Sequence, residues 1–499
     1  MKRLLILTTI ALAVLTATAQ VNELPRSNPA AEGVEPQAIE RMVDTLMALP
    51  GTDIHHLMVL RHGKVIAEAH PAPFVAANEH TLYSCSKTVT ALAVGKLIDQ
   101  GRLSLDARVA RLLPDKCPDS ISPALASMTV HHLLIMGSGL TPSLDFMTSS
   151  NDWVRHWLAG EVTEQGRFRY DSMCTFTLAA IVQRITGMTL LEFVNEHFFN
   201  PMHITVADWE TGPDGVNTAG WGLRLQTESL AKIGLLIMQR GRWNDRQLVS
   251  EHWIDLMTTK HNNYKFPGDT PTDTNQGYCY QMWRCLQPDA VRADGAYGQF
   301  IIVMPKLDMV VVMCGMSTHT ALELAAVWNQ LVPGVKNHAT PSTGLTLLER
   351  KLKTLALPVV EGERGSLERE QWLRHHSVPV DSNARNVKTV TVAPRFAAYE
   401  LQITKNNGKS AFFTLPFATW GKQQKSTMAP PYHSGAMPLD LDTVPGLRND
   451  WLVSGHYAWP TDDTLVMRLY WVNWIAATTI TVHFHPDGTA TATLTDSYP

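Results

Sequence analysis

The residues best suited to chemistry in this chain are Ser84 and Lys87, within the stretch Tyr83-Ser84-Cys85-Ser86-Lys87. The apolar residues of 88–98 recur at helical spacing, which predicts a helix with Ser84 at its start and Lys87 one turn along the same face. A serine hydroxyl needs a base within reach, or a cation that keeps a nearby base deprotonated, and a buried lysine supplies either because desolvation lowers its pKa. The pattern therefore predicts an acyl-transfer nucleophile, with the N–H groups of the helix start near the developing oxyanion.

A second Ser-x-x-Lys pattern, from Ser229 to Lys232, competes with the first. It lies in an amphipathic segment, 228–238, which predicts a helix with Lys232 on a solvated face. Cys85 and the apolar residues after Lys87 instead predict burial of the first helix. We therefore expect Ser84 to be the nucleophile and Ser229 to be structural.

Tyr170 is the expected proton carrier. It precedes a segment, 176–186, that is predicted to be a helix ending at Gly187. A buried tyrosine beside a lysine is expected to lose or relay a proton more easily than a free phenol, so Tyr170 would take the Ser84 proton and pass it to the leaving group. The alternative is an ordinary half-buried aromatic side chain. A second Tyr-x-Ser, 432–434, lacks this context.

A third stretch, Ala293-Asp294-Gly295-Ala296-Tyr297-Gly298-Gln299, leads into an apolar segment, 300–305, that predicts a buried strand paired with 309–314. Gly295 and Gly298 would let the backbone approach a substrate closely. The N–H of Ala296 is expected to complete an oxyanion hole with the N–H of Ser84. The alternative is a glycine-rich hairpin with no part in catalysis.

Together these motifs resemble the serine hydrolases related to class C β-lactamases, D-alanyl-D-alanine carboxypeptidases and family VIII esterases. The resemblance covers roughly residues 30 to 335 and includes the segments 56–64, 101–106, 132–140 and 222–234. It implies an α/β (α+β) fold, in which a β-lactamase-like domain has an antiparallel sheet flanked by helices plus a helical subdomain. It also implies that Ser84 is the nucleophile, Lys87 its partner and Tyr170 the proton shuttle. The N–H groups of Ser84 and Ala296 would form the oxyanion hole. The implied substrate contacts are Ser172, Gly295, Tyr297 and Gly298.

The sequence departs from the family pattern at two places. Ser172 stands where β-lactamases usually carry Asn two residues after the tyrosine. The third family motif, Lys-Thr-Gly or His-x-Gly, falls at Ala293-Asp294-Gly295, so the cation that would hold a β-lactam or D-Ala carboxylate is missing, unless Arg292 supplies it. The resemblance is therefore to the esterase and amide-hydrolase branch.

The N-terminus predicts a cleavable signal peptide over residues 1–19, because a basic start and an apolar segment, 4–15, precede Ala17-Thr18-Ala19. Gln20 would begin the mature chain, and since it is not a cysteine we expect no lipoprotein anchor. No later segment is long and apolar enough to span a membrane. These features predict a periplasmic or secreted protein.

The chain of 499 residues predicts two domains after the signal peptide. A hydrolase domain would cover 24–335, and 336–386 would be a linker with a short helix at 345–357 and a polar segment, 361–386, draped over a surface. The all-β C-terminal domain, 387–499, is expected to be a sandwich or an open barrel. Its expected strands are 387–392, 399–404, 411–415, 465–472 and 478–484. Four tryptophans are expected in its core or at the domain interface more than on a ligand surface: Trp451, Trp459, Trp471 and Trp474.

The expected function is an exported serine hydrolase that acts through an acyl-serine intermediate on an ester or small amide. The alternatives are an acyltransferase that moves an acyl group to a bulky alcohol acceptor, and a penicillin-binding or acylation-sensing protein with little turnover. We expect a small-molecule acyl substrate and no cofactor. The net charge of −4 favours no nucleic-acid partner, and the sequence specifies no oligomeric state.

We expect neither a metal site nor a disulfide framework. The adjacent histidine pairs at 55–56, 131–132 and 375–376 are not expected to share an ion, because neighbours on a strand point to opposite faces. Six cysteines in a chain of this length do not form a disulfide scaffold, and a Cys279–Cys285 bond is not indicated.

Overall fold

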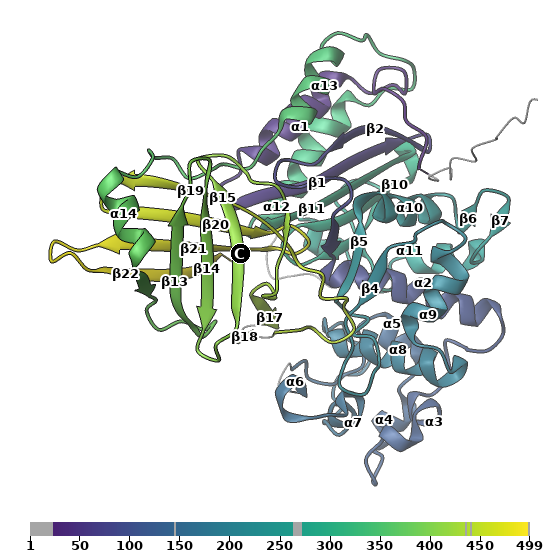
Figure 1. The fold of residues 1–499 in the computed structure, drawn as a ribbon. Coiled ribbons are helices and arrows are strands. Elements are labelled where there is room, and N and C mark those ends of the chain that lie inside the picture. The colour runs from purple at the N-terminus through teal and green to yellow at the C-terminus, as the bar shows by residue number, and fades with distance from the viewer. Residues whose placement is uncertain (1–22, 144–145, 263–271, 435–436, 440–441, 498–499) are drawn as a thin grey trace, which may run out of the picture.

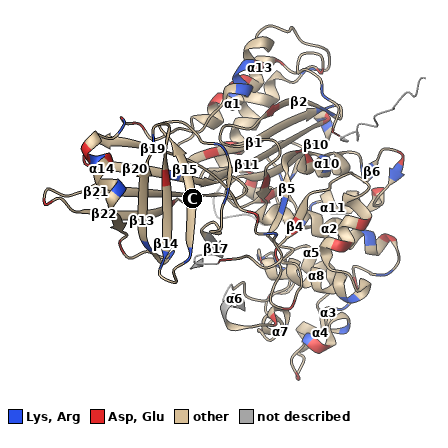
Figure 2. Cartoon of the chain, in the orientation of Figure 1, with Lys and Arg blue, Asp and Glu red and all other residues tan. Residues whose placement is uncertain are grey.

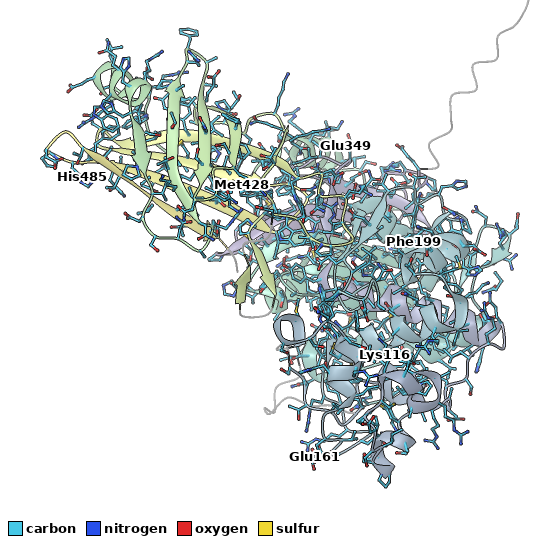
Figure 3. The ribbon with its side chains drawn as sticks, turned by 60° about the horizontal axis from the view of Figure 1, so that its bottom comes forward. Lys116, Glu161, Phe199, Glu349, Met428 and His485 are labelled. Carbon is cyan, nitrogen blue, oxygen red and sulfur yellow. The ribbon has the colours of Figure 1, made fainter. Side chains whose placement is uncertain are left out.

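The computed structural model describes residues 23–143, 146–262, 272–434, 437–439 and 442–497. The predicted signal peptide, 1–19, lies outside these residues. Figure 1 shows a larger lobe of helices and strands beside a smaller lobe made mostly of strands. In Figure 3, Glu161 and His485 mark the far ends of the two lobes and Met428 lies in the smaller one. The predicted architecture, an antiparallel sheet flanked by helices followed by an all-β region, is confirmed.

An antiparallel six-stranded sheet forms the centre of the larger lobe, in the order β2-β1-β11-β10-β9-β8. Its strands are β1 (Thr52–Arg61), β2 (Lys64–Ala69), β8 (Trp283–Arg284), β9 (Val291–Gly295), β10 (Gln299–Met304) and β11 (Met309–Ser317). Alternate residues of a strand face opposite sides, so Met58 and Ile301 enter one apolar core while Leu57 and Phe300 enter another. Burial on both faces explains why β10 and β11 are apolar throughout.

Helices cover both faces of this sheet (Figure 1). On one face α10 (Thr227–Met238) packs on β1, β10 and β11, while α1 (Pro36–Met47) and α13 (Leu345–Thr354) pack on the other side, with α12 (Thr320–Ala326) against α1. Almost all of α10 is buried, including Lys232, whose amine donates to the carbonyl of His203 at 3.3 Å. The expectation of a solvated Lys232 was therefore wrong, because α10 is enclosed by neighbouring segments as well as by the sheet.

A helical region lies beyond α10 and carries most of the remaining core of the larger lobe. Its helices are α2 (Ser86–Asp99), α3 (Val109–Leu112), α4 (Pro123–Ser127), α5 (Val130–Leu134), α6 (Phe146–Ser149), α7 (Trp153–Leu158), α8 (Ser172–Thr186), α9 (Leu190–Val194) and α11 (Glu251–Thr258). A small sheet, β3 (Glu79–Thr81), β5 (Leu223–Gln226) and β4 (Ala207–Trp209), joins it to the large sheet. The hairpin of β6 (Arg242–Trp243) and β7 (Arg246–Gln247) lies at its edge.

The described part of the chain contains no single helix with the length and apolar composition needed to cross a bilayer. The segments Ser172–Thr186 and Leu190–Phe199 pass that test only as a pair, bent by 74°. The first of these segments is α8, which is buried in the core of the helical region.

The smaller lobe is a β-sandwich, one of the two architectures predicted. One sheet contains β12 (Ser377–Pro379), β13 (Val387–Pro394), β14 (Ala398–Lys405) and β15 (Ser410–Pro416). The other contains β16 (Gln424–Lys425), β19 (Leu452–Thr461), β20 (Thr464–Trp471), β21 (Ala476–Phe484) and β22 (Ala490–Ser497), and β17 (Tyr432–Ser434) with β18 (Met437–Leu439) forms a separate hairpin. The alternation of buried and exposed residues along β13–β15 is that of a sheet with one face in the core.

Several sequence expectations for this lobe need correction. The polar segment 361–386 contains a helix, α14 (Leu367–His375), and the edge strand β12, so it is part of the sandwich. Strands β19 and β22 were not predicted. The four tryptophans are at most 2 % exposed. They pack in the sandwich core, in agreement with the expectation that they are core residues and do not line a ligand surface.

A β-bulge overturns the reasoning about the first histidine pair. The register between β1 and β11 shifts between Ile54 and His56, and a bulge re-aims a side chain. His55 and His56 consequently both contact the ring of Phe74, and His55 Nδ1 lies 2.8 Å from His80 Nε2. Burial holds the pKa of both β1 histidines well below its usual value. They are therefore neutral groups in the domain interface.

A buried ion pair joins the two lobes. Arg224 on β5 is fully buried and donates to both carboxylate oxygens of Asp208, at 2.8 and 2.5 Å, and to Asp450 of the smaller lobe at 3.0 Å. Its guanidinium also lies over the ring of Trp451. Figure 2 shows the other charged residues interspersed along the ribbon of both lobes. This pair therefore anchors the docking of the sandwich against the small sheet.

Removing this anchor should destabilise the protein strongly. Arg224→Met leaves Asp208 buried without its main partner, which should lower the free energy of unfolding by about 3 kcal/mol. Arg26→Met is the matched control, because Arg26 is 37 % exposed and its ion pairs with Glu68 and Glu228 should contribute less than about 1 kcal/mol. Urea unfolding of both variants measures the difference, and equal shifts in the two would contradict the anchoring role.

Candidate active site

The nucleophile candidate Ser84 lies in a short 3₁₀ turn, Tyr83–Cys85, directly before α2. The turn is tied to its surroundings on both sides. The Cys85 thiol lies 3.1 Å from the carbonyl of Gln299 on β10, and the Ser86 hydroxyl donates to the carbonyl of Tyr83 at 2.7 Å while it accepts the N–H of Leu223 at 3.3 Å. These contacts hold Ser84 between the large sheet and the helical region.

Lys87 meets three oxygen atoms and no carboxylate. Its Nζ lies 2.9 Å from Ser84 Oγ, 3.0 Å from Ser172 Oγ and 2.6 Å from the carbonyl oxygen of Gly220. The residue is 1 % exposed, and burial lowers the pKa of its amine to about 7. A neutral amine has two N–H donors and one lone pair. If the donors go to Gly220 and Ser172, the lone pair faces Ser84.

Tyr170 and Ser172 approach from the start of α8. Asp171 caps this helix, since its carboxylate accepts the N–H of Met173 at 2.8 Å and the indole N–H of Trp157 at 2.9 Å. The cap fixes its two neighbours, so that Tyr170 hydrogen-bonds Ser84 and Ser172 contacts Lys87. Ser172, predicted as a substrate contact, therefore orients the amine.

The protonation of Tyr170 corrects the sequence-based expectation. Burial raises the pKa of its phenol well above the usual value, so Tyr170 loses its proton less easily than a free phenol. Its ring faces two further groups: the Lys87 Nζ lies 4.9 Å from the ring centroid, and the ring stacks on Trp283 at 5.6 Å. A neutral Lys87 amine is thus suited to accept a proton and the protonated Tyr170 phenol to donate one, and the aromatic face favours an ammonium at Lys87.

The turn after β9 lies beside the Ser84 turn. A Cβ at Gly295 would stand 2.3 Å from the carbonyl oxygen of Leu82, so only glycine permits this approach. Ala296 follows and is exposed. The ring of Tyr297 contacts the ring of Tyr83 edge to face, and a Cβ at Gly298, whose φ is +90°, would stand 2.7 Å from the carboxyl oxygens of Glu323. Gly298 is thus explained by packing against Glu323.

Arg292 does not replace the missing cation. Its side chain is 1 % exposed, its Nε donates to Asp294 at 2.8 Å, and its Nη1 donates to the carbonyl of Arg284 at 2.8 Å. The guanidinium carbon lies 5.8 Å from the ring centroid of Trp283. The charge of Arg292 is therefore neutralised by its ion pair with Asp294.

Three groups in or beside the site escaped sequence reasoning. The Gly220 carbonyl is a backbone atom and leaves no signal in residue types. Trp283 sits on a strand of two residues, too short for a periodic pattern. Glu323 is 0 % exposed, and burial raises its pKa to about 8; its place behind Gly298 depends on a contact between distant segments.

The cysteines and the groups that could bind a metal ion are the remaining candidates for reactive groups. All six cysteines are buried and free, so Cys279 and Cys285 form no disulfide. Within the described residues, no group of three or more His, Cys, Asp or Glu side chains has an arrangement suited to a metal ion.

Comparison with known proteins gives one family. The family model described as Beta-lactamase matches residues 39–331. The chain is 24 % identical over 324 residues to the 6-aminohexanoate-dimer hydrolase of Paenarthrobacter ureafaciens, which covers 60 % of this chain and 82 % of that protein. It is 36 % identical over 91 residues to Esterase EstB of Burkholderia gladioli, covering 17 % and 23 % of the two chains. A solved structure from Bacteroides dorei, described as a beta-lactamase, superposes with a TM-score of 0.50 at 18 % identity and covers 64 % of this chain and 98 % of that one.

The depressed pKa of Lys87 predicts how the reactivity of Ser84 depends on pH. Only the neutral amine accepts the Ser84 proton, so the second-order rate of labelling by a fluorophosphonate probe should rise with pH, level off above about 7 and have its midpoint there. Tyr170→Phe is the control. It should lower the rate but leave the midpoint in place, because the phenol stays protonated throughout this range. A rate that is flat or falls between pH 6 and 8 would contradict the assignment of Lys87 as the base.

Proposed function

This chain belongs to the beta-lactamase family, and on that premise we propose that it is a serine hydrolase that cleaves a neutral ester or small amide through an acyl intermediate on Ser84. The observation that carries the proposal is the contact of 2.9 Å between Ser84 Oγ and a lysine amine whose pKa burial lowers to about 7. Burial also lowers the pKa of Lys232 in α10, but that amine donates to the carbonyl of His203, so the contact with a serine hydroxyl is what distinguishes Lys87. Relatives named as an esterase and as a 6-aminohexanoate-dimer hydrolase support a hydrolytic reaction.

In the acylation step the neutral Lys87 amine takes the proton of Ser84 as Oγ attacks the substrate carbonyl carbon. The carbonyl oxygen becomes an oxyanion, and the N–H groups of Ser84 and Ala296 are the donors we assign to it. Collapse breaks the bond to the leaving group, which takes a proton from Tyr170. The proton held by Lys87 then replaces the one that Tyr170 has lost. Water attacks the acyl-serine with the same groups in the reverse order, which releases the acid and restores Ser84.

The charges around the site favour a neutral substrate. Recognition of a carboxylate usually employs an arginine or lysine that faces it. Here Arg292 is buried and paired, and the partly exposed group at this position is the Asp294 carboxylate. Because Arg292 and Asp294 neutralise each other, an anionic substituent placed there gains no compensating charge from this pair, so the proposed substrates are uncharged at the position where a β-lactam carries its carboxylate.

Two parts of the proposal concern context. We propose that the protein is exported to the periplasm or secreted, on the strength of the signal peptide predicted at residues 1–19.

Transfer of the acyl group to an alcohol in place of water is the alternative outcome of the second step. It is recognised by formation of a new ester when an alcohol acceptor is added to the assay.

The choice of nucleophile is tested by two matched serine variants. Ser84→Ala should abolish fluorophosphonate labelling and reduce hydrolysis of a p-nitrophenyl ester to near background, since no acyl intermediate forms. Ser229→Ala should retain both, because Ser229 is buried within α10. Labelling without turnover in the wild-type protein would instead identify an acylation sensor, and full labelling of Ser84→Ala would overturn the assignment.

The substrate class is tested by comparing two reactions. The kcat/KM for a short-chain p-nitrophenyl ester should exceed that for nitrocefin, whose carboxylate finds no free cation at the third motif. Arg292→Gln should leave the ratio of the two constants unchanged, because its guanidinium does not reach the substrate. If nitrocefin is the better substrate and Arg292→Gln removes that preference, the proposed substrate class is wrong.

A further inference from the structure

Two tyrosines stand directly beside the reacting groups. Tyr83 precedes Ser84, and Tyr297 follows Ala296. Their rings meet edge to face, with centroids 5.3 Å apart and an angle of 87° between the ring planes. This geometry is a favourable aromatic contact. It is a direct side-chain link between the turn that carries the nucleophile and the turn that carries the assigned oxyanion donor.

Both tyrosines hold a backbone conformation that bulky residues avoid. The φ angle is +44° at Tyr83 and +68° at Tyr297, in the left-handed region. Such conformations persist only where the surroundings over-determine them, and they gather at functional sites. The sequence of either turn alone does not favour this shape, so contacts made by the two rings must hold it.

Apolar side chains around the rings supply part of those contacts. Both rings pack against the apolar cluster that contains the sandwich core together with Phe74, Met316 and Leu357. The turn at Tyr297 is fixed from behind as well, because its carbonyl accepts the N–H of Ser317 at 3.1 Å. The Tyr83 hydroxyl is buried and has no hydrogen-bond partner among the described residues. The ring of Tyr83 is therefore held by shape and apolar contact.

We infer that the Tyr83–Tyr297 ring pair sets the spacing between Ser84 Oγ and the N–H of Ala296. This inference rests on the proposed function, in which those two groups act on one carbonyl. Tyr83 and Tyr297 are positioning residues, since they act through their neighbours. Their loss should weaken interactions made only in the transition state, which lowers the maximal rate and leaves binding intact.

The test measures fluorophosphonate inactivation of the full-length protein over a range of probe concentrations, which separates the maximal rate, kinact, from the half-saturating concentration, KI. Tyr83→Leu and Tyr297→Leu should each lower kinact at least about tenfold with KI little changed, because displacement of catalytic groups by about 1 Å can cost a hundredfold. The double variant should be scarcely worse than either single variant, since the two rings act as one unit. Tyr83→Phe and Tyr297→Phe keep the ring and should restore kinact to within about threefold.

A control separates positioning from loss of stability. Tyr399 stacks on Tyr457 at 3.6 Å inside the sandwich, away from Ser84. Tyr399→Leu also breaks a tyrosine pair and should lower the unfolding temperature at least as much as Tyr297→Leu, with kinact unchanged at a temperature where all variants are folded. The inference is overturned if the Leu variants keep wild-type kinact, or if Tyr399→Leu lowers it equally. Failure of the proposed function is distinguishable, because it shows as labelling that survives Ser84→Ala.

Discussion

The burial of one lysine amine among neutral oxygen atoms is the constraint on which the site depends. Lys87 contacts two hydroxyls and one carbonyl and is almost fully removed from water. An ammonium in that setting lacks both hydration and a counter-ion in contact, so its pKa falls to about 7. The same neighbours leave one direction for the lone pair of the neutral amine, toward Ser84. A basic side chain and its orientation therefore follow from a single packing arrangement.

The fold meets this constraint by bringing four distant segments to one point. The 3₁₀ turn of Tyr83–Cys85 and α2 supply Ser84 and Lys87, and the start of α8 supplies Tyr170 and Ser172. The backbone before β5 supplies the carbonyl of Gly220, and the turn between β9 and β10 supplies Ala296. Each segment is anchored by burial on both sides of the large sheet or by the core of the helical region. A rigid scaffold is what holds a catalytic group to within a fraction of an ångström.

The smaller lobe is attached to the larger lobe by buried polar contacts and by a shared apolar cluster. A buried arginine pairs with carboxylates from both lobes, and Nε2 of the neutral His55, at the bulge in β1, lies 2.8 Å from the Tyr470 hydroxyl of the sandwich. The rings of Tyr83 and Tyr297 pack against the apolar cluster that contains the sandwich core together with Phe74, Met316 and Leu357. Desolvated polar contacts of this kind fix one docked geometry, because a displaced partner would leave a buried charge or donor unpaired. The position of the sandwich on the larger lobe is thus fixed by buried contacts.

The sequence by itself determined the nucleophile motif, the strands with continuous apolar residues, the all-β character of the C-terminal region and the burial of its tryptophans, because these depend on residue type and local periodicity. It misjudged Lys232 and the protonation of Tyr170, since the pKa and exposure of a side chain depend on everything packed around it. It also misread His55 and His56, because a register shift against β11 changes the direction of a side chain and leaves no mark in composition. Tertiary structure alone decided three contacts. The Lys87 amine donates to the Gly220 carbonyl, Arg292 forms an ion pair with Asp294, and the ring of Tyr83 packs against the ring of Tyr297. Gly220 and Lys87, like Tyr83 and Tyr297, lie far apart in the chain, and no local pattern specifies the distance between them. Arg292 and Asp294 lie two residues apart on β9, and the burial of the Arg292 side chain, which depends on distant segments, decides that they pair.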